Sequence, residues 1–259
     1  MRLQYGSEPL QFGELRLPSG EGPHAVAIVI HGGFWRAAYD LEHINGACEA
    51  LTRAGVATWN LEYRRIGNPG GGWSGTLQDV AQGADHLRIL ATGYQLDLWR
   101  VAAVGHSAGG HLALWLAARR RLPSGSALYS RDPLGLRGAV SLAGVADLRR
   151  AWDLRLSSGV VSAFLGGAPQ EVPERYRQAS PIELLPLGVP QRLIHGTNDT
   201  TVPIEIARTY VGAAVAAGDD AKLVELPGAG HFEAIDPGSQ EWPIVEATVL
   251  SLLGDRSER

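Results

Sequence analysis

The chain has 259 residues, one cysteine and a formal net charge of −4, and 45% of its residues are hydrophobic. This length and composition suit one large α/β domain or two small ones with a sizeable core. The acidic balance and the lack of a basic stripe with interleaved aromatic residues argue against a nucleic-acid-binding surface. The single cysteine, Cys48, excludes an intramolecular disulfide and fits a cytoplasmic location. The first residues lack the apolar core of a signal peptide, and no apolar run is long enough to cross a membrane.

Apolar runs alternate along the chain with segments of helical periodicity. Residues 3–17 predict an antiparallel hairpin at the edge of a sheet, and strand-like runs follow at 25–30, 56–63, 101–104, 138–143, 191–195 and 221–226. Helical patterns cover residues 41–53, 77–90, 110–118, 203–217 and 242–253. The alternation predicts one α/β domain over residues 1–259, with a mostly parallel sheet of about eight strands and helices on both faces.

The segment from about 147 to 190 lacks strand signals and is longer than a simple crossover connection. It carries Trp152, Phe164 and several prolines and glycines. We interpret it as a small cap-like insertion over the carboxyl edge of the sheet, where open α/β sheets bind their ligands.

The pentapeptide Gly105-His106-Ser107-Ala108-Gly109 has the pattern G-x-S-x-G and lies between a strand-like run and a helical pattern. In that context the pattern predicts a tight strand-to-helix turn that exposes a strained serine. The start of the helix offers backbone N–H groups to a developing oxyanion. We therefore expect the Ser107 hydroxyl to be a nucleophile and the Ala108 N–H to be one oxyanion donor.

A serine hydroxyl needs a base to remove its proton, and the base needs an acid that orients it. The order expected for this architecture is nucleophile, acid, histidine. Asp199 and His231 each follow a strand-like run downstream of Ser107, so all three side chains are expected at the same sheet edge. Asp147 also follows a strand-like run, but chain order favours Asp199 as the acid and a capping role for Asp147.

The remaining histidines are expected to have no catalytic role. We predict that His43 is a solvated helix residue and that the side chain of His106 points away from the serine hydroxyl. We expect His111 and His195 to be buried by packing, and His31 to make structural hydrogen bonds.

The segment His31-Gly32-Gly33-Phe34-Trp35 follows the first buried parallel strand. Its glycines permit a tight turn with inward N–H groups, so we expect Gly33 and Phe34 to complete the oxyanion hole with Ala108. Several aromatic residues could wall a substrate pocket. Trp35 and Phe232 are the pocket candidates that adjoin predicted catalytic residues.

Together these residues resemble the α/β-hydrolase superfamily over essentially the whole chain. The H-G-G-F-W segment is similar to an element of kynurenine formamidase-like enzymes and to the H-G-G-G element of hormone-sensitive-lipase-type esterases, with Phe34 replacing the third glycine. Gly105 to His111 is similar to the nucleophile elbow of both groups, and His195-Gly196 with Asp199 is similar to their acid loop. The resemblance implies hydrolysis through an acyl-enzyme, without a metal or an organic cofactor.

The first functional hypothesis is a serine carboxylesterase acting on small short-chain or aryl esters. The alternative is an arylformamidase that hydrolyses N-formylkynurenine-type amides. A peptidase and a non-catalytic binding protein are weaker hypotheses, the latter because all three triad residues are present. The expected partner is a small-molecule ester or amide, with no nucleic acid and no membrane, and the sequence leaves the oligomeric state open, a homodimer included.

Overall fold

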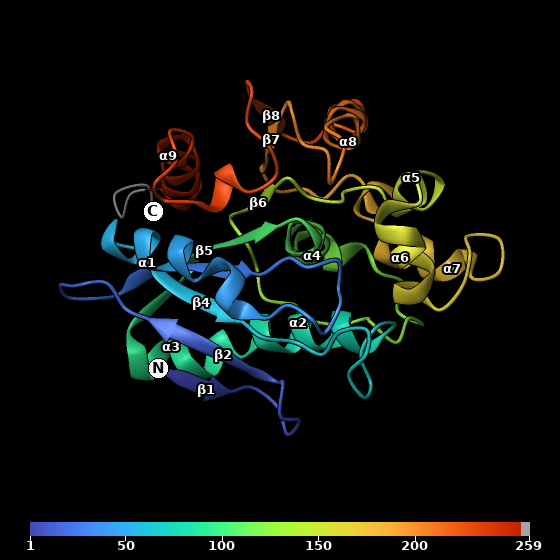
Figure 1. Cartoon of the computed structure of the whole chain (residues 1–259). Helices are drawn as coiled ribbons and strands as arrows, with labels where there is room; N and C mark the ends of the chain where they lie inside the picture. The colour runs from blue at the N-terminus through green and yellow to red at the C-terminus, as the bar shows by residue number, and fades with distance from the viewer. Residues whose placement is uncertain (255–259) are drawn as a thin grey trace.

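The computed structural model describes residues 1–254, and its centre is an eight-stranded sheet in the order β1-β2-β4-β3-β5-β6-β7-β8 (Figure 1). The six strands β4, β3, β5, β6, β7 and β8 run parallel to one another. The strands β1 and β2 pair antiparallel, and β2 also pairs antiparallel with β4. This arrangement confirms the predicted mostly parallel sheet and the predicted hairpin at its edge.

The strands of the described chain are β1 (Arg2–Gln4), β2 (Phe12–Arg16), β3 (His24–Ile30), β4 (Ala57–Leu61), β5 (Leu96–His106), β6 (Gly138–Leu142), β7 (Gln191–Gly196) and β8 (Ala221–Leu226). The α-helices are α1 (Asn45–Arg53), α2 (Gly75–Asp85), α3 (Leu87–Tyr94), α4 (Ala108–Ala118), α5 (Leu148–Asp153), α6 (Leu156–Leu165), α7 (Pro173–Ala179), α8 (Glu205–Ala216) and α9 (Trp242–Leu253). Short 3₁₀ helices are η1 (Leu41–Ile44), η2 (Arg119–Arg121), η3 (Pro181–Leu184) and η4 (Glu233–Ile235).

The sheet is buried on both faces because its parallel strands carry apolar side chains on both. In β3, Val26, Ile28 and Ile30 pack with α2, α3, α4 and α8, whereas Ala27 and Val29 pack with α1 and α9. This period of two is the geometry of a strand with apolar side chains on both faces. Figure 1 shows α9 and α2 on opposite sides of the sheet.

Two predicted helices are each divided in the structure. The pattern over residues 41–53 becomes η1 followed by α1, because Ile44 leaves the helical region at φ −121° and ψ 10°. The pattern over residues 77–90 becomes α2 and α3, with His86 between them. The strand predicted at 101–104 is longer in the structure and runs from Leu96 to His106. Periodicity marks the buried face of an element better than it marks where the backbone bends.

The chain between β6 and β7 contains α5, α6, α7 and η3, and these helices lie together at one end of the molecule (Figure 1). Their apolar side chains, Val161, Phe164 and Tyr176 among them, are buried in the same core as α4. That this segment is a cap on a single domain stays a prediction. None of the helices within residues 1–254 has the length and apolar character needed to span a membrane.

Candidate active site

Ser107 lies at the turn between β5 and α4, with φ 57° and ψ −118°. This conformation is sterically strained for a residue with a side chain, and the surrounding structure must hold it in place. The Ser107 N–H donates to the carbonyl oxygen of Leu142 at 2.8 Å, which ties the turn to the end of β6. The strained strand-to-helix turn is the conformation predicted from the pentapeptide.

The glycines of the pentapeptide are required by close approach of the backbone. A Cβ atom on Gly105 would lie 2.0 Å from the carbonyl oxygen of Gly109, and a Cβ atom on Gly109 would lie 2.0 Å from the carbonyl oxygen of Ile30. Neither position accepts a larger residue unless α4 moves away from β3 and β5. The two glycines therefore allow the start of α4 to lie directly against the sheet, beside Ser107.

The loop after β3 passes beside the same serine. A Cβ atom on Gly32 would lie 3.1 Å from the Cβ atom of Ser107, so the loop and the serine are in direct contact. Gly33 and Phe34 follow with positive φ values of 104° and 51°. Both residues line the cavity that contains Ser107. Their assignment as oxyanion donors, like that of Ala108, stays a prediction.

Asp199 and His231 are joined by a short hydrogen bond. His231 Nδ1–H donates to Asp199 Oδ2 at 2.6 Å, although the two residues follow different strands, β7 and β8. The other carboxylate oxygen, Oδ1, accepts the N–H groups of Thr201 at 2.8 Å and Val202 at 2.9 Å. His195 Nε2 lies 3.2 Å from Asp199 Oδ2 as well. Four groups therefore hold the Asp199 carboxylate in place: the side chains of His231 and His195 and the backbone N–H groups of Thr201 and Val202.

This environment keeps Asp199 ionised. Burial by itself raises the pKa of the carboxyl group, but the hydrogen bonds from His195, His231 and the Val202 amide outweigh it, and the pKa lies well below its usual range. An ionised Asp199 orients the His231 ring with the proton on Nδ1. The lone pair of a neutral His231 is then on Nε2, the nitrogen that a general base uses.

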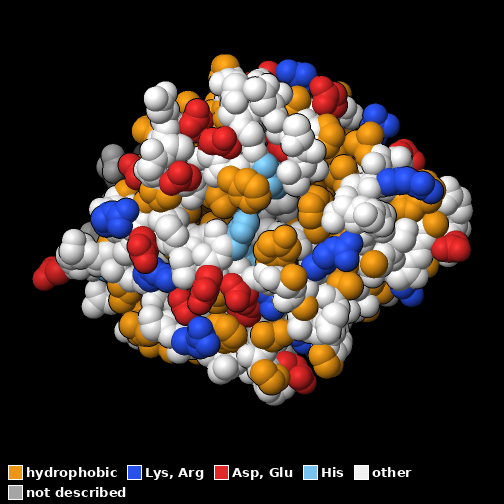
Figure 2. All heavy atoms as spheres, in the orientation of Figure 1, with side chains coloured by type: hydrophobic (Ala, Val, Ile, Leu, Met, Phe, Trp, Pro, Cys, Tyr) orange, Lys and Arg blue, Asp and Glu red, His pale blue; other side chains and the backbone are white. Residues whose placement is uncertain are grey.

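A cavity of about 210 Å³ brings several predicted site residues together, and its lining includes Ser107, His231, Gly33, Phe34 and Phe232. Figure 2 shows histidine side chains, in pale blue, near the centre of this face of the molecule and between hydrophobic side chains. Phe232 is 57% exposed and packs edge-on against the His231 ring. No Asp, Glu, Lys or Arg within residues 1–254 lines this cavity.

Sequence reasoning missed four further residues of the cavity lining, which are Tyr39, His43, His106 and Thr201. The prediction that His43 is a solvated helix residue is wrong, because its ring is half-buried and stacks on the ring of His106. The His106 ring lies 4.6 Å from the His231 ring, centre to centre, and lines the same cavity, whereas its predicted orientation away from the Ser107 hydroxyl stays a prediction. No local pattern marks these contacts, since they join segments more than sixty residues apart.

The interpretation of Trp35 as a pocket residue is also wrong. Its side chain is completely buried, stacks on Phe164 at 4.6 Å and donates a hydrogen bond to His111 Nδ1. The positive φ of Trp35, 56°, turns the chain so that Phe34 and Trp35 face different surroundings. Phe34 lines the cavity, and Trp35 joins the core beneath it.

Other expectations are confirmed. His111 is buried and donates through Nε2 to the carbonyl oxygen of Ala179 at 2.9 Å. His195 is buried at the end of β7. Asp147 is the N-cap of α5, where its side chain accepts the N–H of Arg150 at 3.0 Å.

Comparison with known proteins leads to the same architecture. The sequence matches the BD-FAE family over residues 14–211, which is well over half of the chain. The chain belongs to the BD-FAE family.

Relatives of this BD-FAE family member include the esterase LipC of Mycobacterium tuberculosis, which is 29% identical over 97% of this chain and 64% of its own length. Isoprenylcysteine α-carbonyl methylesterase of Arabidopsis thaliana is 27% identical over 89% of this chain and 56% of its own length. The chain thus spans less than two thirds of these relatives. They are esterases, and they lend no support to the predicted resemblance to kynurenine formamidase-like enzymes.

Among solved structures, a truncated carbohydrate esterase from gut microbiota superposes with a TM-score of 0.81, with 97% of this chain and 95% of the other covered. The sequence identity is 22%, so this likeness concerns the fold. Together with the strand order, it confirms the predicted α/β-hydrolase fold for this BD-FAE family member.

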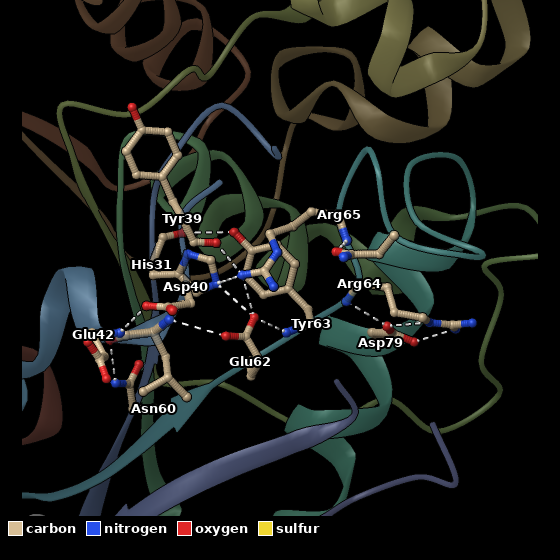
Figure 3. Close-up of polar contacts among 12 residues, drawn as sticks. His31, Tyr39, Asp40, Glu42, Asn60, Glu62, Tyr63, Arg64, Arg65 and Asp79 are labelled. Atoms are coloured by element: carbon tan, nitrogen blue, oxygen red, sulfur yellow. Dashed lines mark hydrogen bonds and ion pairs between the residues drawn. The ribbon is translucent and has the colours of Figure 1, made fainter. Parts of the chain in front are cut away.

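A second carboxylate–imidazole pair lies close to the first loop of the site (Figure 3). His31 Nε2 lies 3.2 Å from Glu62 Oε1, and Arg65 Nη1 lies 2.7 Å from the same oxygen. All three side chains are buried, and the His31 ring stacks on Tyr63 at 4.4 Å. His31 Nδ1–H donates to the carbonyl oxygen of Gly32. These bonds confirm the structural role expected for His31.

A larger cavity, of about 660 Å³, lies between α5 and α6 beside Trp152, Arg155 and Ser158. It contains neither Ser107 nor His231, and so we place the candidate active site at the smaller cavity. None of the residues lining the smaller cavity comes from the segment 147–190. Within residues 1–254 no group of three His, Cys, Asp or Glu side chains is arranged to hold a metal ion.

Proposed function

We propose that this BD-FAE family member is a serine hydrolase that cleaves small carboxylic esters. Ser107 acts as the nucleophile, His231 as the general base and Asp199 as the residue that orients His231. The observation that carries the proposal is that Ser107 and His231 line one cavity while Asp199 accepts the Nδ1 proton of His231 at 2.6 Å. This is the arrangement of roles that defines a Ser-His-Asp triad.

The reaction proceeds in two halves. His231 Nε2 takes the proton of the Ser107 hydroxyl as the oxygen attacks the ester carbonyl carbon, and the oxyanion is stabilised by the N–H groups of Gly33, Phe34 and Ala108. His231 then gives this proton to the leaving alkoxide, and the acyl group remains on Ser107. Water, activated by His231, attacks the acyl-enzyme and releases the carboxylic acid.

The substrate class follows from the size and lining of the cavity. Its volume of about 210 Å³ lies below the roughly 300–1,000 Å³ of pockets that hold drug-sized ligands, which favours a short acyl group or a small aryl ester. The aromatic rings of Phe34, Tyr39 and Phe232 line it, and no Asp, Glu or Lys side chain within residues 1–254 does, which favours a neutral ester. The esterase names of the relatives support the same reaction. A cytoplasmic location and a homodimer stay predictions.

Steady-state kinetics with p-nitrophenyl acetate and p-nitrophenyl butyrate test the proposal, with N-formylkynurenine as the competing substrate class. We expect the ester to give the larger kcat/KM and a fluorophosphonate to label Ser107. Ser107→Ala should fold normally and lose both turnover and labelling. A wild-type enzyme that neither turns over esters nor reacts with the fluorophosphonate would be a binding protein, and the proposal would be wrong.

A further inference from the structure

His231 must reach Ser107 across part of the sheet. Ser107 follows β5 and His231 follows β8, and the strands β6 and β7 lie between them. Three inter-strand spacings correspond to about 14 Å. The loop after β8 therefore has to fold back over the carboxyl ends of two strands. A catalytic geometry that tolerates errors of about 0.5 Å needs something that holds this loop in place.

His106 makes the contact that spans this gap. Its Nε2 lies 2.8 Å from the carbonyl oxygen of His231. A carbonyl oxygen can only accept, so His106 carries its proton on Nε2, and its Nδ1 is an acceptor. His43 Nε2–H donates to this Nδ1 at 2.8 Å. His43 thus donates a hydrogen bond to His106, and His106 donates one to the main-chain carbonyl oxygen of His231.

We call the hydrogen-bonded series from His43 through His106 to the His231 carbonyl the histidine relay. His106 must be neutral in this relay, because its Nδ1 accepts a hydrogen bond while its Nε2–H donates one. His106 is fully buried, and burial first, then the neighbouring His231 and His43, holds the pKa of its imidazole well below the usual value. Burial, with His31 and His231 nearby, lowers the pKa of His43 to about 4. The ring of Phe232, which lines the same cavity, contacts the rings of His43, His106 and His231 at 5.0 to 6.2 Å between ring centres.

The other end of the relay is anchored in the buried polar cluster of Figure 3. His43 lies on η1, and the first residue of η1, Leu41, donates its N–H to Glu62 Oε2 at 3.2 Å. Asn60 Nδ2 donates to the carbonyl oxygen of Leu41 at 3.1 Å. Arg65, paired with Glu62, donates to the carbonyl oxygen of Tyr39. The element that carries His43 is therefore bonded to β4 and to the chain that follows it.

We propose that His43 and His106 are positioning residues that hold the main chain of His231 in place opposite Ser107. The inference rests on the proposed function, because it concerns the base of that reaction. Residue 106 immediately precedes the nucleophile, so its bond to the His231 carbonyl ties the loop of the base directly to the nucleophile turn. His43 acts through His106 and completes its hydrogen bonding.

The test begins at His43, because it is half-buried whereas His106 is fully buried. His43→Phe keeps a ring against His106 and removes the donor. We expect kcat for p-nitrophenyl acetate to fall about tenfold, with KM changed less than about twofold, because the base is displaced and ester binding is not. His43→Gln keeps an N–H donor at the corresponding place, and we expect it to restore kcat to within about threefold of wild type.

His106 supplies the second pair of variants. We expect His106→Phe to lower kcat and the rate of fluorophosphonate labelling by more than His43→Phe does, and His106→Gln to recover part of both. The downfield proton resonance of the His231 Nδ1–H···Asp199 bond should broaden or shift in His43→Phe and stay in place in His43→Gln. A purely structural role of His43 would not move that signal.

His111→Phe is the matched control. His111 is also fully buried, donates from Nε2 to a carbonyl oxygen and accepts at Nδ1 from the indole N–H of Trp35. We expect it to lower the melting temperature as much as the His106 variants while kcat stays within about twofold of wild type.

Three results would overturn the inference. They are a wild-type kcat in His43→Phe, equal losses in His43→Phe and His43→Gln, or a loss in His43→Phe no larger than that in His111→Phe. A failure of the proposed function is a different outcome, since the wild-type protein itself would then neither hydrolyse esters nor be labelled at Ser107.

Discussion

Two carboxylate–imidazole pairs within residues 1–254, Asp199 with His231 and Glu62 with His31, differ in their access to a cavity: His231 lines one, whereas His31 is completely buried. Asp199 Oδ2 lies 2.6 Å from His231 Nδ1, and His231 lines the same cavity as Ser107. Glu62 Oε1 lies 3.2 Å from His31 Nε2 and 2.7 Å from Arg65 Nη1, and all three side chains are buried. The two pairs have the same chemical groups in different surroundings.

The same two chemical groups, a carboxylate and an imidazole, thus occur in two different surroundings, and only His231 of the two imidazoles is proposed as a catalytic base. In the Glu62 pair, Arg65 neutralises the carboxylate, and the bonds made by Glu62 hold the chain at Leu41 and Tyr63. In the Asp199 pair, backbone N–H groups and His195 hold the carboxylate, and no cationic Lys or Arg within residues 1–254 makes an ion pair with it. His231 lines a cavity and Glu62 is paired with Arg65, and these two observations separate the base that we propose at His231 from the structural role of His31.

The largest expected difference is between the two histidines. If the proposed triad is right, we expect His231→Gln to lower kcat for p-nitrophenyl acetate by about 10⁶-fold, as removal of the catalytic histidine does in a serine protease. We expect His31→Gln to keep kcat within about tenfold of wild type and to lower the free energy of unfolding by about 1–3 kcal/mol through lost buried hydrogen bonds. Urea unfolding and steady-state kinetics measure both. Equal losses of kcat in the two variants would contradict the assignment of His231 as the base and of His31 as a structural residue.

The carboxylates give the next largest contrast. We expect Asp199→Asn to lower kcat about 10⁴-fold, because the amide no longer selects the Nδ1–H tautomer of His231. We expect Glu62→Gln to lower the free energy of unfolding by about 3–5 kcal/mol, because Arg65 is left as an unpaired buried charge, and to affect kcat far less. If Glu62→Gln melts like wild type, the ion pair with Arg65 is not what stabilises this cluster.

The response to acid sharpens the comparison further. Burial lowers the pKa of His111 from 6.5 to about 4, so the unfolded chain binds more protons than the folded protein between these values. The free energy of unfolding must then fall as the pH falls through this window, by about 2 kcal/mol between pH 7 and pH 5 for this residue. Asp199, with its pKa held below 3.8, contributes stability that is lost only at still lower pH.

Melting temperatures at pH 7 and pH 5 measure this effect. We expect Asp199→Asn to show the same drop between the two pH values as wild type, and His111→Phe to show a smaller one. A drop that disappears in Asp199→Asn would assign the acid sensitivity to the active-site pair instead.

The smallest expected effect concerns the exposed ring that covers the active-site pair. We expect Phe232→Ala to raise KM by a factor of about three and to change kcat less, because the ring lines the cavity and packs edge-on against His231. Phe232→Leu, which keeps apolar volume, serves as the control and should lie between wild type and the alanine variant. A large fall in kcat with unchanged KM would instead place Phe232 among the residues that position His231.

Much of the site could be predicted because its signals are local. Ser107 lies in a motif whose glycines are required by approaches of 2.0 Å, and such approaches leave a pattern in the sequence. Asp199 and His231 follow β7 and β8, and parallel strands bring the residues after them to one edge. The roles of His43 and Trp35 could not be predicted, because each depends on a partner from a distant segment, His106 in one case and Phe164 in the other.

The sequence by itself determined the alternation of strands and helices, the strained turn at Ser107 and the placement of an acid and a histidine after later strands. These features depend on periodicity and turn chemistry, and both are properties of residues that are neighbours in the chain. Only the tertiary structure decided which of two carboxylate–imidazole pairs meets a cavity, which receives an arginine, and that His106 binds the His231 carbonyl. These outcomes depend on burial and on contacts between segments far apart in the chain, and burial exists only once the sheet has assembled.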